Sequence, residues 1–189
     1  TIRSTVSHGN AIGCYFLDPE GNPVEVQSPH TAQELGIATL HQELAIVPGL
    51  SVAENIFLGR LPISGGKVDR ALINERSAEA LRKLGVNIDP RRPVQGLSIA
   101  LQQSIEIAKA ITRDPRYVIF DEPSASLTEK ETDRVLGQIQ VLRDHGAGII
   151  YISHRLQEIR DIANEIVCMR DGRVVKTWDT GNVETDELV

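Results

Sequence analysis

The 189-residue chain has little of what several classes of protein require. Its two cysteines, Cys14 and Cys168, stand far apart and outside any CxxC or Cys/His grouping, so neither a zinc site nor a disulfide framework is indicated. No apolar run approaches the roughly 18 residues needed to span a bilayer. The net charge of −6 argues against a protein that binds nucleic acid by broad phosphate neutralisation. We therefore expect a reduced, cytosolic setting.

A hydrophobic content of 41% and a charged content of 24% suffice for a folded domain with a buried core. The apolar runs at 117–120 and 148–154 predict strands, the first of them buried on both faces. Segments of helical periodicity lie between and around these runs: 97–115 opened by Ser98, Thr128 to Gly146, and 156–164. This alternation predicts a doubly wound, mostly parallel α/β sheet.

Antiparallel hairpins are expected alongside this sheet. CYFLDPEGNPVEV (14–26) contains two short β-rich runs around a turn, and EIVCMRDGRVVKTW (165–178) contains Asp171-Gly172, a pair suited to a type I′ turn. Residues 36–42 form another short β-rich run. A further helix is predicted from Asp69, as N-cap, to Gly85, where it stops.

Polar side chains follow three of the predicted strands: Gln42, the pair Asp121-Glu122, and His154. Because ligands of open α/β sheets gather at the carboxyl ends of the strands, we expect these side chains to converge. Taken singly, a histidine at a strand end or a polar Gln42 is more often an ordinary surface or core residue. Their joint arrival at one edge predicts a functional site.

The two acids suit phosphoryl transfer. A carboxylate directly after a buried strand can hold Mg²⁺ together with phosphate oxygens, and its neighbour can orient and deprotonate an attacking water. We assign Asp121 to the metal and Glu122 to the water. The alternative is that both acids merely cap the following helix, but Thr128 and Glu131 form a capping box that gives that helix its own start.

Five motifs in order together resemble the ATP-binding cassette (ABC) ATPases. HQE (41–43) looks like the Q-loop, LSIALQQSIEIAKA (97–110) stands where that family has its LSGGQ-type signature, YVIFDEP (117–123) looks like Walker B with the catalytic glutamate, SASLT (124–128) looks like the D-loop, and ISH (152–154) looks like the switch-histidine loop. GIATLHQELAIVPGLSVAENIFLGR (36–60) is further similar to the first of two fused cassettes in bacterial importers of ribose, galactose, xylose or arabinose.

The resemblance implies an ATPase that uses ATP and Mg²⁺ to power monosaccharide import, with a P-loop-NTPase-type parallel sheet, antiparallel β elements and a helical subdomain at about 43–112. Glu122 and His154 would be catalytic and Asp121 and Gln42 would hold the metal. Gln42 would also sense the γ-phosphate, while Ser126 of the D-loop would contact nucleotide.

The resemblance also implies partners. Two cassettes would close head to tail on ATP, with Ser98 contacting the partner's nucleotide in trans. A helix N-terminus does favour phosphate, although a plain N-cap serine has the same geometry. The implied partners are a second cassette, transmembrane permease subunits and, indirectly, a periplasmic sugar-binding protein, with no nucleic acid. The implied location is peripheral, on the cytoplasmic face of the inner membrane.

A P-loop, G-x-x-x-x-G-K-[ST], is not found. Gly66-Lys67 is followed by Val68, so we interpret SGGKV as a solvent loop. We interpret the chain as an incomplete cassette, truncated before the Q-loop region, and predict that it is inactive in isolation.

One departure lies within the signature: Leu101 stands where the ABC family usually has Gln. Loss of a capping interaction there would cost roughly 0.5–2 kcal/mol. Together with the P-loop that is not found, Leu101 leaves open an alternative, a degenerate cassette that no longer hydrolyses ATP and serves as a structural or dimerisation partner. A soluble ABC ATPase of DNA repair or translation would be expected to show a coiled-coil insertion or basic surfaces, and neither is seen.

Overall fold

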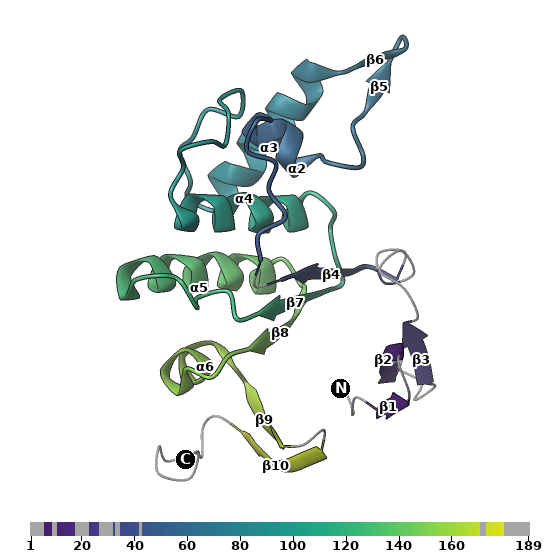
Figure 1. The fold of residues 1–189 in the computed structure, drawn as a ribbon, viewed down its shortest axis with the longest axis vertical. Coiled ribbons are helices and arrows are strands. Elements are labelled where there is room, and N and C mark those ends of the chain that lie inside the picture. Colours follow the sequence, from purple (N-terminus) through teal and green to yellow (C-terminus); the bar gives the residue numbers. More distant parts are fainter. Residues whose placement is uncertain are drawn as a thin grey trace. The chain divides into compact units, whose positions relative to one another are not determined.

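The computed structural model describes residues 6–8, 11–17, 23–26, 32, 35–41, 43–170 and 173–179. Figure 1 labels the helices and strands of the chain, which divides into two units. One unit is Gly36–His154, and the other combines Thr1–Leu35 with Arg155–Val189.

A parallel sheet in the order β4-β7-β8 forms the base of the Gly36–His154 unit. Its strands are β4 (Ile37–Leu40), β7 (Tyr117–Asp121) and β8 (Gly148–Ile152). Leu40 pairs with Phe120, and Asp121 pairs with Ile152, so the three carboxyl ends lie at one edge of the sheet. The predicted parallel pairing is thereby confirmed.

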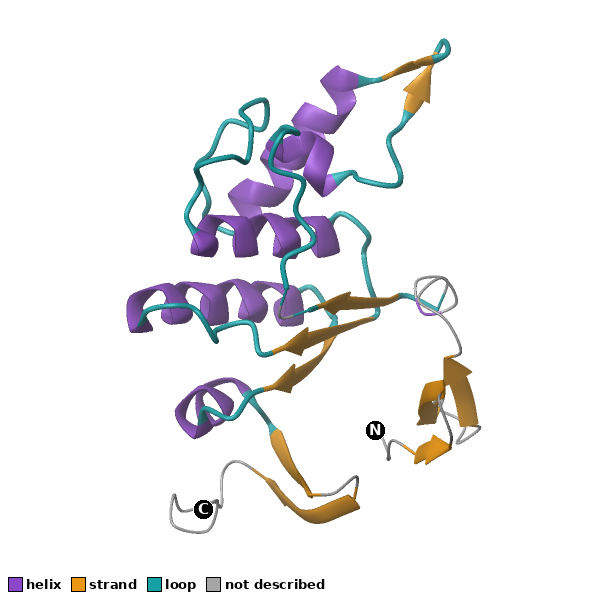
Figure 2. Cartoon of the chain, in the orientation of Figure 1, coloured by secondary structure: helices purple, strands orange, loops and turns teal. Residues whose placement is uncertain are grey.

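The prediction that the 117–120 strand is buried on both faces is only half right. Val118 and Phe120 are fully buried, whereas Ile119 is half-buried and Tyr117 is 39% exposed. This alternation is what a sheet shows when one of its faces is covered. Figure 2 shows helices α4 and α5 side by side next to the strands, and these helices contact β4 and β8 respectively.

Four helices of this unit begin at side-chain caps, and three of the four were predicted. They are α2 (Val52–Ile56), α3 (Arg70–Lys83), α4 (Ile99–Ile111) and α5 (Glu129–Asp144), with N-caps Ser51, Asp69, Ser98 and Thr128. Helix α3 ends before Gly85, whose φ of +67° suits glycine at a helix end. The unpredicted helix, α2, has a readable start, because Ser51 and Glu54 form a capping box.

Helices α2, α3 and α4 pack against one another, and α4 also packs on α5. Apolar side chains with almost no exposure fill this core: Val52, Ile56, Ile73, Leu81, Ile105, Ile107, Val135 and Ile139. Burying such a side chain contributes about 1.5–3 kcal/mol. Helix α4 therefore connects the helical layer to the part of the unit that contains the sheet.

SGGKV is not a plain solvent loop, as the sequence led us to expect. Strands β5 (Ile63–Ser64) and β6 (Lys67–Val68) pair antiparallel across Gly65 and Gly66. Both glycines have positive φ, 57° and 78°, as a two-residue type I′ turn requires. The Gly-Gly pair was the signal for this hairpin.

The second unit contains both expected hairpins. Strands β1 (Val6–His8), β2 (Ala11–Leu17) and β3 (Pro23–Val26) form an antiparallel sheet in that order. Helix α6 (Leu156–Ile162) precedes β9 (Glu165–Arg170), which pairs antiparallel with β10 (Arg173–Asp179). The predicted turn at Asp171-Gly172 lies outside the described residues.

Candidate functional site

The backbone turns sharply where β7 ends. Glu122 has φ +47°, in the left-handed region that side-chain-bearing residues rarely adopt. Two hydrogen bonds hold this turn: the Glu122 N–H donates to the Ile152 carbonyl at 2.9 Å, and the Ala125 N–H donates to the Glu122 carbonyl at 3.2 Å. The turn thus begins at Glu122, directly after Asp121, the last residue of the strand.

The structure brings Glu122 and His154 together across the sheet edge. Nδ1 of His154 lies 3.1 Å from Oε1 of Glu122. The side chains are 71% and 32% exposed respectively, so water reaches the pair. A proton on Nδ1 lets the imidazole donate to the Glu122 carboxylate, and a proton on Nε2 as well would let the same ring donate to a phosphate oxygen.

The alternative role of the acids as helix caps is not what the structure shows. Thr128 is the N-cap of α5, and its N–H donates to Oε2 of Glu131 at 3.0 Å. The Thr128 hydroxyl lies 2.8 Å from the same carboxylate oxygen. Ser126, in the loop before this helix, is exposed. The acids are therefore not needed to start α5.

Ser98 is the N-cap of α4, so the prediction that it opens this helix is confirmed. Its side chain is exposed and accepts from the Leu101 N–H at 3.4 Å. The side chain of the next residue, Gln102, reaches back and donates to the Leu97 carbonyl at 2.9 Å. The side chain of Leu101 cannot hydrogen-bond back to the backbone of Ser98. The side chain of Gln102 stabilises the same end of the helix instead.

The prediction for Gln42 concerns a residue outside the described part of the chain. The structure thus brings together Asp121, Glu122 and His154 at one edge, and places Ser98 at the start of α4. Ser126 lies in the loop that follows the acids.

Asp121 and Glu122 alone offer few ligands for a metal ion. The described residues contain no group of three or more His, Cys, Asp or Glu side chains that could hold a metal ion. Mg²⁺ characteristically takes one or two carboxylates and fills its other positions with phosphate oxygens and water. Asp121, half-buried at the strand end, fits that requirement.

A polar cluster around Asn55, which is 1% exposed in α2, was not predicted from the sequence. Its Oδ1 accepts from the Val47 N–H at 2.8 Å, and its Nδ2 donates to the carbonyls of Val47 and Ser51 at 3.1 and 3.0 Å. Asn55 therefore fixes the loop before α2 onto that helix. A polar residue at a buried position of a helical pattern is the signal that could have found it.

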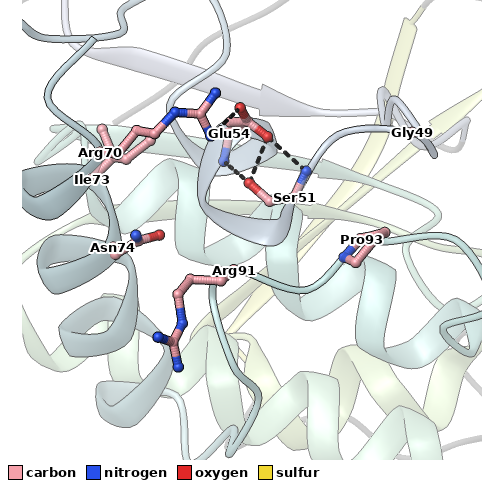
Figure 3. Close-up of a pocket in the computed structure, with 8 residues that line it drawn as sticks. All are labelled: Gly49, Ser51, Glu54, Arg70, Ile73, Asn74, Arg91 and Pro93. Atoms are coloured by element: carbon pink, nitrogen blue, oxygen red, sulfur yellow. Dashed lines mark hydrogen bonds and ion pairs between the residues drawn. The ribbon is translucent and has the colours of Figure 1, made fainter.

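A recess of about 200 Å³ lies beside α2 (Figure 3). Its wall includes Glu54, which accepts from the Ser51 N–H at 2.9 Å and lies 3.3 Å from Arg70. The hydrogen bond from the Ser51 side chain is the main reason that the pKa of Glu54 is lowered from its ordinary value of 4.5. The lining residues are Gly49, Ser51, Glu54, Arg70, Ile73, Asn74, Arg91 and Pro93.

Comparison with known proteins decides the family. The family described as ABC transporter matches residues 17–125. The chain belongs to the ABC transporter family. Membership implies binding of ATP, and the family resemblance read from the five motifs is confirmed.

Relatives of this ABC chain have names that refer to sugar import. The ribose import ATP-binding protein RbsA 3 of Rubrobacter xylanophilus is 47% identical over 169 residues, covering 89% of this chain and 34% of the relative. A putative ribose/galactose/methyl galactoside import ATP-binding protein of Burkholderia ambifaria is 46% identical over 170 residues, covering 90% of this chain and 33% of the relative. The chain thus spans about a third of the length of these curated relatives.

The fold expected from the sequence is confirmed as well. A solved nucleotide-free ATP-binding cassette from an ABC transporter superimposes with a TM-score of 0.72 at 18% identity, covering 90% of this chain and 70% of that chain. In the part of the chain that the structure describes, no helix is both long and apolar enough to cross a membrane.

Proposed function

We propose that this protein hydrolyses ATP to power import of a monosaccharide through a membrane partner. The observation that carries the proposal is the 3.1 Å contact between Glu122 and His154, directly after two parallel strands. The names of the relatives, which refer to ribose and galactose import, support the sugar class.

In this proposal Glu122 orients the attacking water and accepts its proton. Its carboxylate is 32% exposed, so it is open to water yet held by His154 and by the turn at its own backbone. His154 hydrogen-bonds a terminal phosphate oxygen and keeps the carboxylate aimed. Asp121, together with Gln42, would hold Mg²⁺, which when bound neutralises charge on the phosphates.

The remaining assignments concern the assembly. The chain would be a cassette in which about 43–112 is a helical subdomain that docks on permease subunits. The recess beside α2 lies within that segment, and in this proposal it would receive a side chain of the permease. Ser98 and Ser126 would contact nucleotide, Ser98 in trans on a second cassette. The protein would lie peripherally on the cytoplasmic face of the inner membrane, with a periplasmic sugar-binding protein acting indirectly.

A second candidate function rests on Leu101. A cassette that has lost hydrolysis would serve as a structural or dimerisation partner. The cap supplied by Gln102 weakens this alternative, because the start of α4 is stabilised without a polar side chain at position 101.

The test uses the full-length protein, reconstituted in proteoliposomes with its permease and binding protein. We expect ATP hydrolysis that rises when ribose, galactose, xylose or arabinose is supplied, and accumulation of that sugar in the vesicles. Hydrolysis that no sugar of this panel stimulates would contradict the substrate class. Nucleotide binding with no hydrolysis under any condition would favour the structural candidate.

A further inference from the structure

The side chain of Arg60 joins the C-terminal ends of two helices. Its Nη1 donates to the Thr112 carbonyl at 2.9 Å, and its Nη2 donates to the carbonyls of Lys109 and Ile56, both at 3.3 Å. Nη2 also donates to the Thr112 hydroxyl. Ile56 ends α2, whereas Lys109 and Thr112 belong to the last turn and C-cap of α4.

Arg60 completes the hydrogen bonding at the end of α4. The last carbonyls of a helix have no partner within the helix. The backbone N–H groups of Thr112, Arg113 and Asp114 donate to the carbonyls of Ala108, Ala110 and Ile111. The Thr112 carbonyl accepts from Arg60, and the Lys109 carbonyl accepts from both Arg60 and the Thr112 hydroxyl. A residue outside α4 thus supplies part of its C-cap.

No carboxylate is among the described contacts of the Arg60 guanidinium. Burial, followed by the charges of Arg113 and Arg76, lowers the pKa of Arg60 to about 10, so the group stays charged at neutral pH. Its Cζ lies 4.8 Å from the centroid of the Phe57 ring, where a cation is favoured. A positive charge at helix C-termini is also favoured by the helix dipole. This planar fork, which serves several carbonyls at once, is a geometry that lysine cannot reproduce.

Helix α4 lies between two parts of the candidate site. It begins at Ser98, and the chain leaves its other end through Asp114, at φ +49°, to enter β7 with Asp121 at its end. We propose that Arg60 is a positioning residue, which ties α2 to α4 so that a displacement of α2 moves the Ser98 end of α4. This inference rests on the proposed function, because the displacement would come from the permease docked on the helical segment.

The test compares variants of the full-length importer in proteoliposomes. R60M removes every donor, and R60K keeps the charge but loses the fork. T112V keeps both carbonyls but removes the Thr112 hydroxyl, which accepts from Arg60 and donates to the Lys109 carbonyl at 2.9 Å. R82M, which changes an exposed arginine of α3, is the matched control. Thermal unfolding, ATP binding, ATP hydrolysis and sugar uptake are measured for each, below the unfolding temperature of the weakest variant.

The informative quantity is the amount of sugar imported per ATP hydrolysed, because loss of folded protein lowers both rates together and leaves this ratio unchanged. We expect R60M to lower the ratio about fivefold or more, which is the low end of coupling between two sites. R60K should restore it in part, and R82M should match the wild type. If R60M does not fold, T112V should still lower the ratio about twofold, as the loss of the hydrogen bond from Arg60 to the Thr112 hydroxyl allows.

A ratio equal to the wild type in R60M would overturn the inference, whether or not both rates had fallen. If folded R60M cannot be obtained, a ratio equal to the wild type in both R60K and T112V would overturn the inference instead. A wild-type protein without sugar-stimulated hydrolysis would instead refute the proposed function, so the two failures are distinguishable.

Discussion

The ring of Tyr117 lies against the α-carbon of Gly148, its partner across the β7–β8 pair. A Cβ at position 148 would stand 2.6 Å from Cδ1 and 2.9 Å from Cε1 of Tyr117, closer than real Cβ contacts. Gly148 also donates its N–H to the Arg116 carbonyl at 2.8 Å. The first residue of β8 is therefore a glycine for a steric reason.

We predict that Gly148→Ala lowers the free energy of unfolding by about 1–2 kcal/mol, because the aromatic ring has to move away. Gly137→Ala is the matched control: position 137 is exposed in α5 with nothing within 4 Å of an added Cβ, so alanine there should raise stability by roughly 0.5–1 kcal/mol. Urea unfolding midpoints measure both. Equal effects of the two alanines on the free energy of unfolding would refute the steric explanation. It would also be refuted if Gly148→Ala lowered this free energy as much in a Tyr117→Ala background as in the wild type.

Glu122→Gln is predicted to lower ATP turnover of the full-length protein by at least about 100-fold while nucleotide binding is retained. Glutamine has the same shape and tolerates the same backbone turn, but it cannot accept the proton of water. Phosphate release in steady state and a binding titration measure the two quantities. Glu129→Gln, an exposed acid of α5, serves as control. Turnover close to the wild type in Glu122→Gln would show that another group is the base.

The stability of the helical segment should depend on pH through Glu54. Its pKa in the folded protein is lowered from 4.5, chiefly by the hydrogen bond from the Ser51 side chain, so ionised Glu54 stabilises the fold. The sign follows from linkage: this contribution is complete above pH 4.5 and is lost as pH falls through the lower folded-state pKa. Glu54→Gln should be less stable than the wild type at pH 7, and the difference should shrink in acid. Denaturant unfolding from pH 7 to pH 3 measures it, with exposed Glu75→Gln as control; a constant difference would contradict the prediction.

A buried polar pair joins α4 to α5. Ser104 and Gln138 are 0% and 2% exposed, Oγ of Ser104 lies 3.0 Å from Nε2 of Gln138, and that amide also donates to the Leu84 carbonyl at 3.4 Å. Gln138→Leu should cost about 1–3 kcal/mol, because it leaves buried groups unpaired. In the Gln138→Leu background, Ser104→Ala should lower the free energy of unfolding by less than it does in the wild type. The difference, which is the coupling energy, should be at least about 0.5 kcal/mol. Gln140→Leu, on the same helix but less buried, is the control, and additive effects would argue against the pair.

Features with a local cause could be predicted from the sequence. Asp69, Ser98 and Thr128 each cap a helix through contacts within a few residues, so residue type and spacing sufficed to find them. The meeting of Glu122 and His154 was predictable for a different reason: neighbouring parallel strands bring their carboxyl ends to one edge.

Other features depend on partners far along the chain or on backbone geometry. Arg60 contacts Thr112 across 52 positions, and Ser104 contacts Gln138 across 34, distances at which no local pattern specifies a contact. Helix α2 has five residues, too few for helical periodicity to be visible. The left-handed φ of Glu122 was unreadable because glutamate has no preference for that region.

The turn at Glu122 has a practical consequence for engineering. The left-handed region costs an ordinary L-residue about 1–2 kcal/mol, and glycine avoids that cost. Selection for heat resistance alone would thus favour glycine at position 122 and discard the carboxylate proposed to act on water. At this residue, thermal stability and ATP turnover make opposite demands, so thermostable variants should be sought at other positions in the chain.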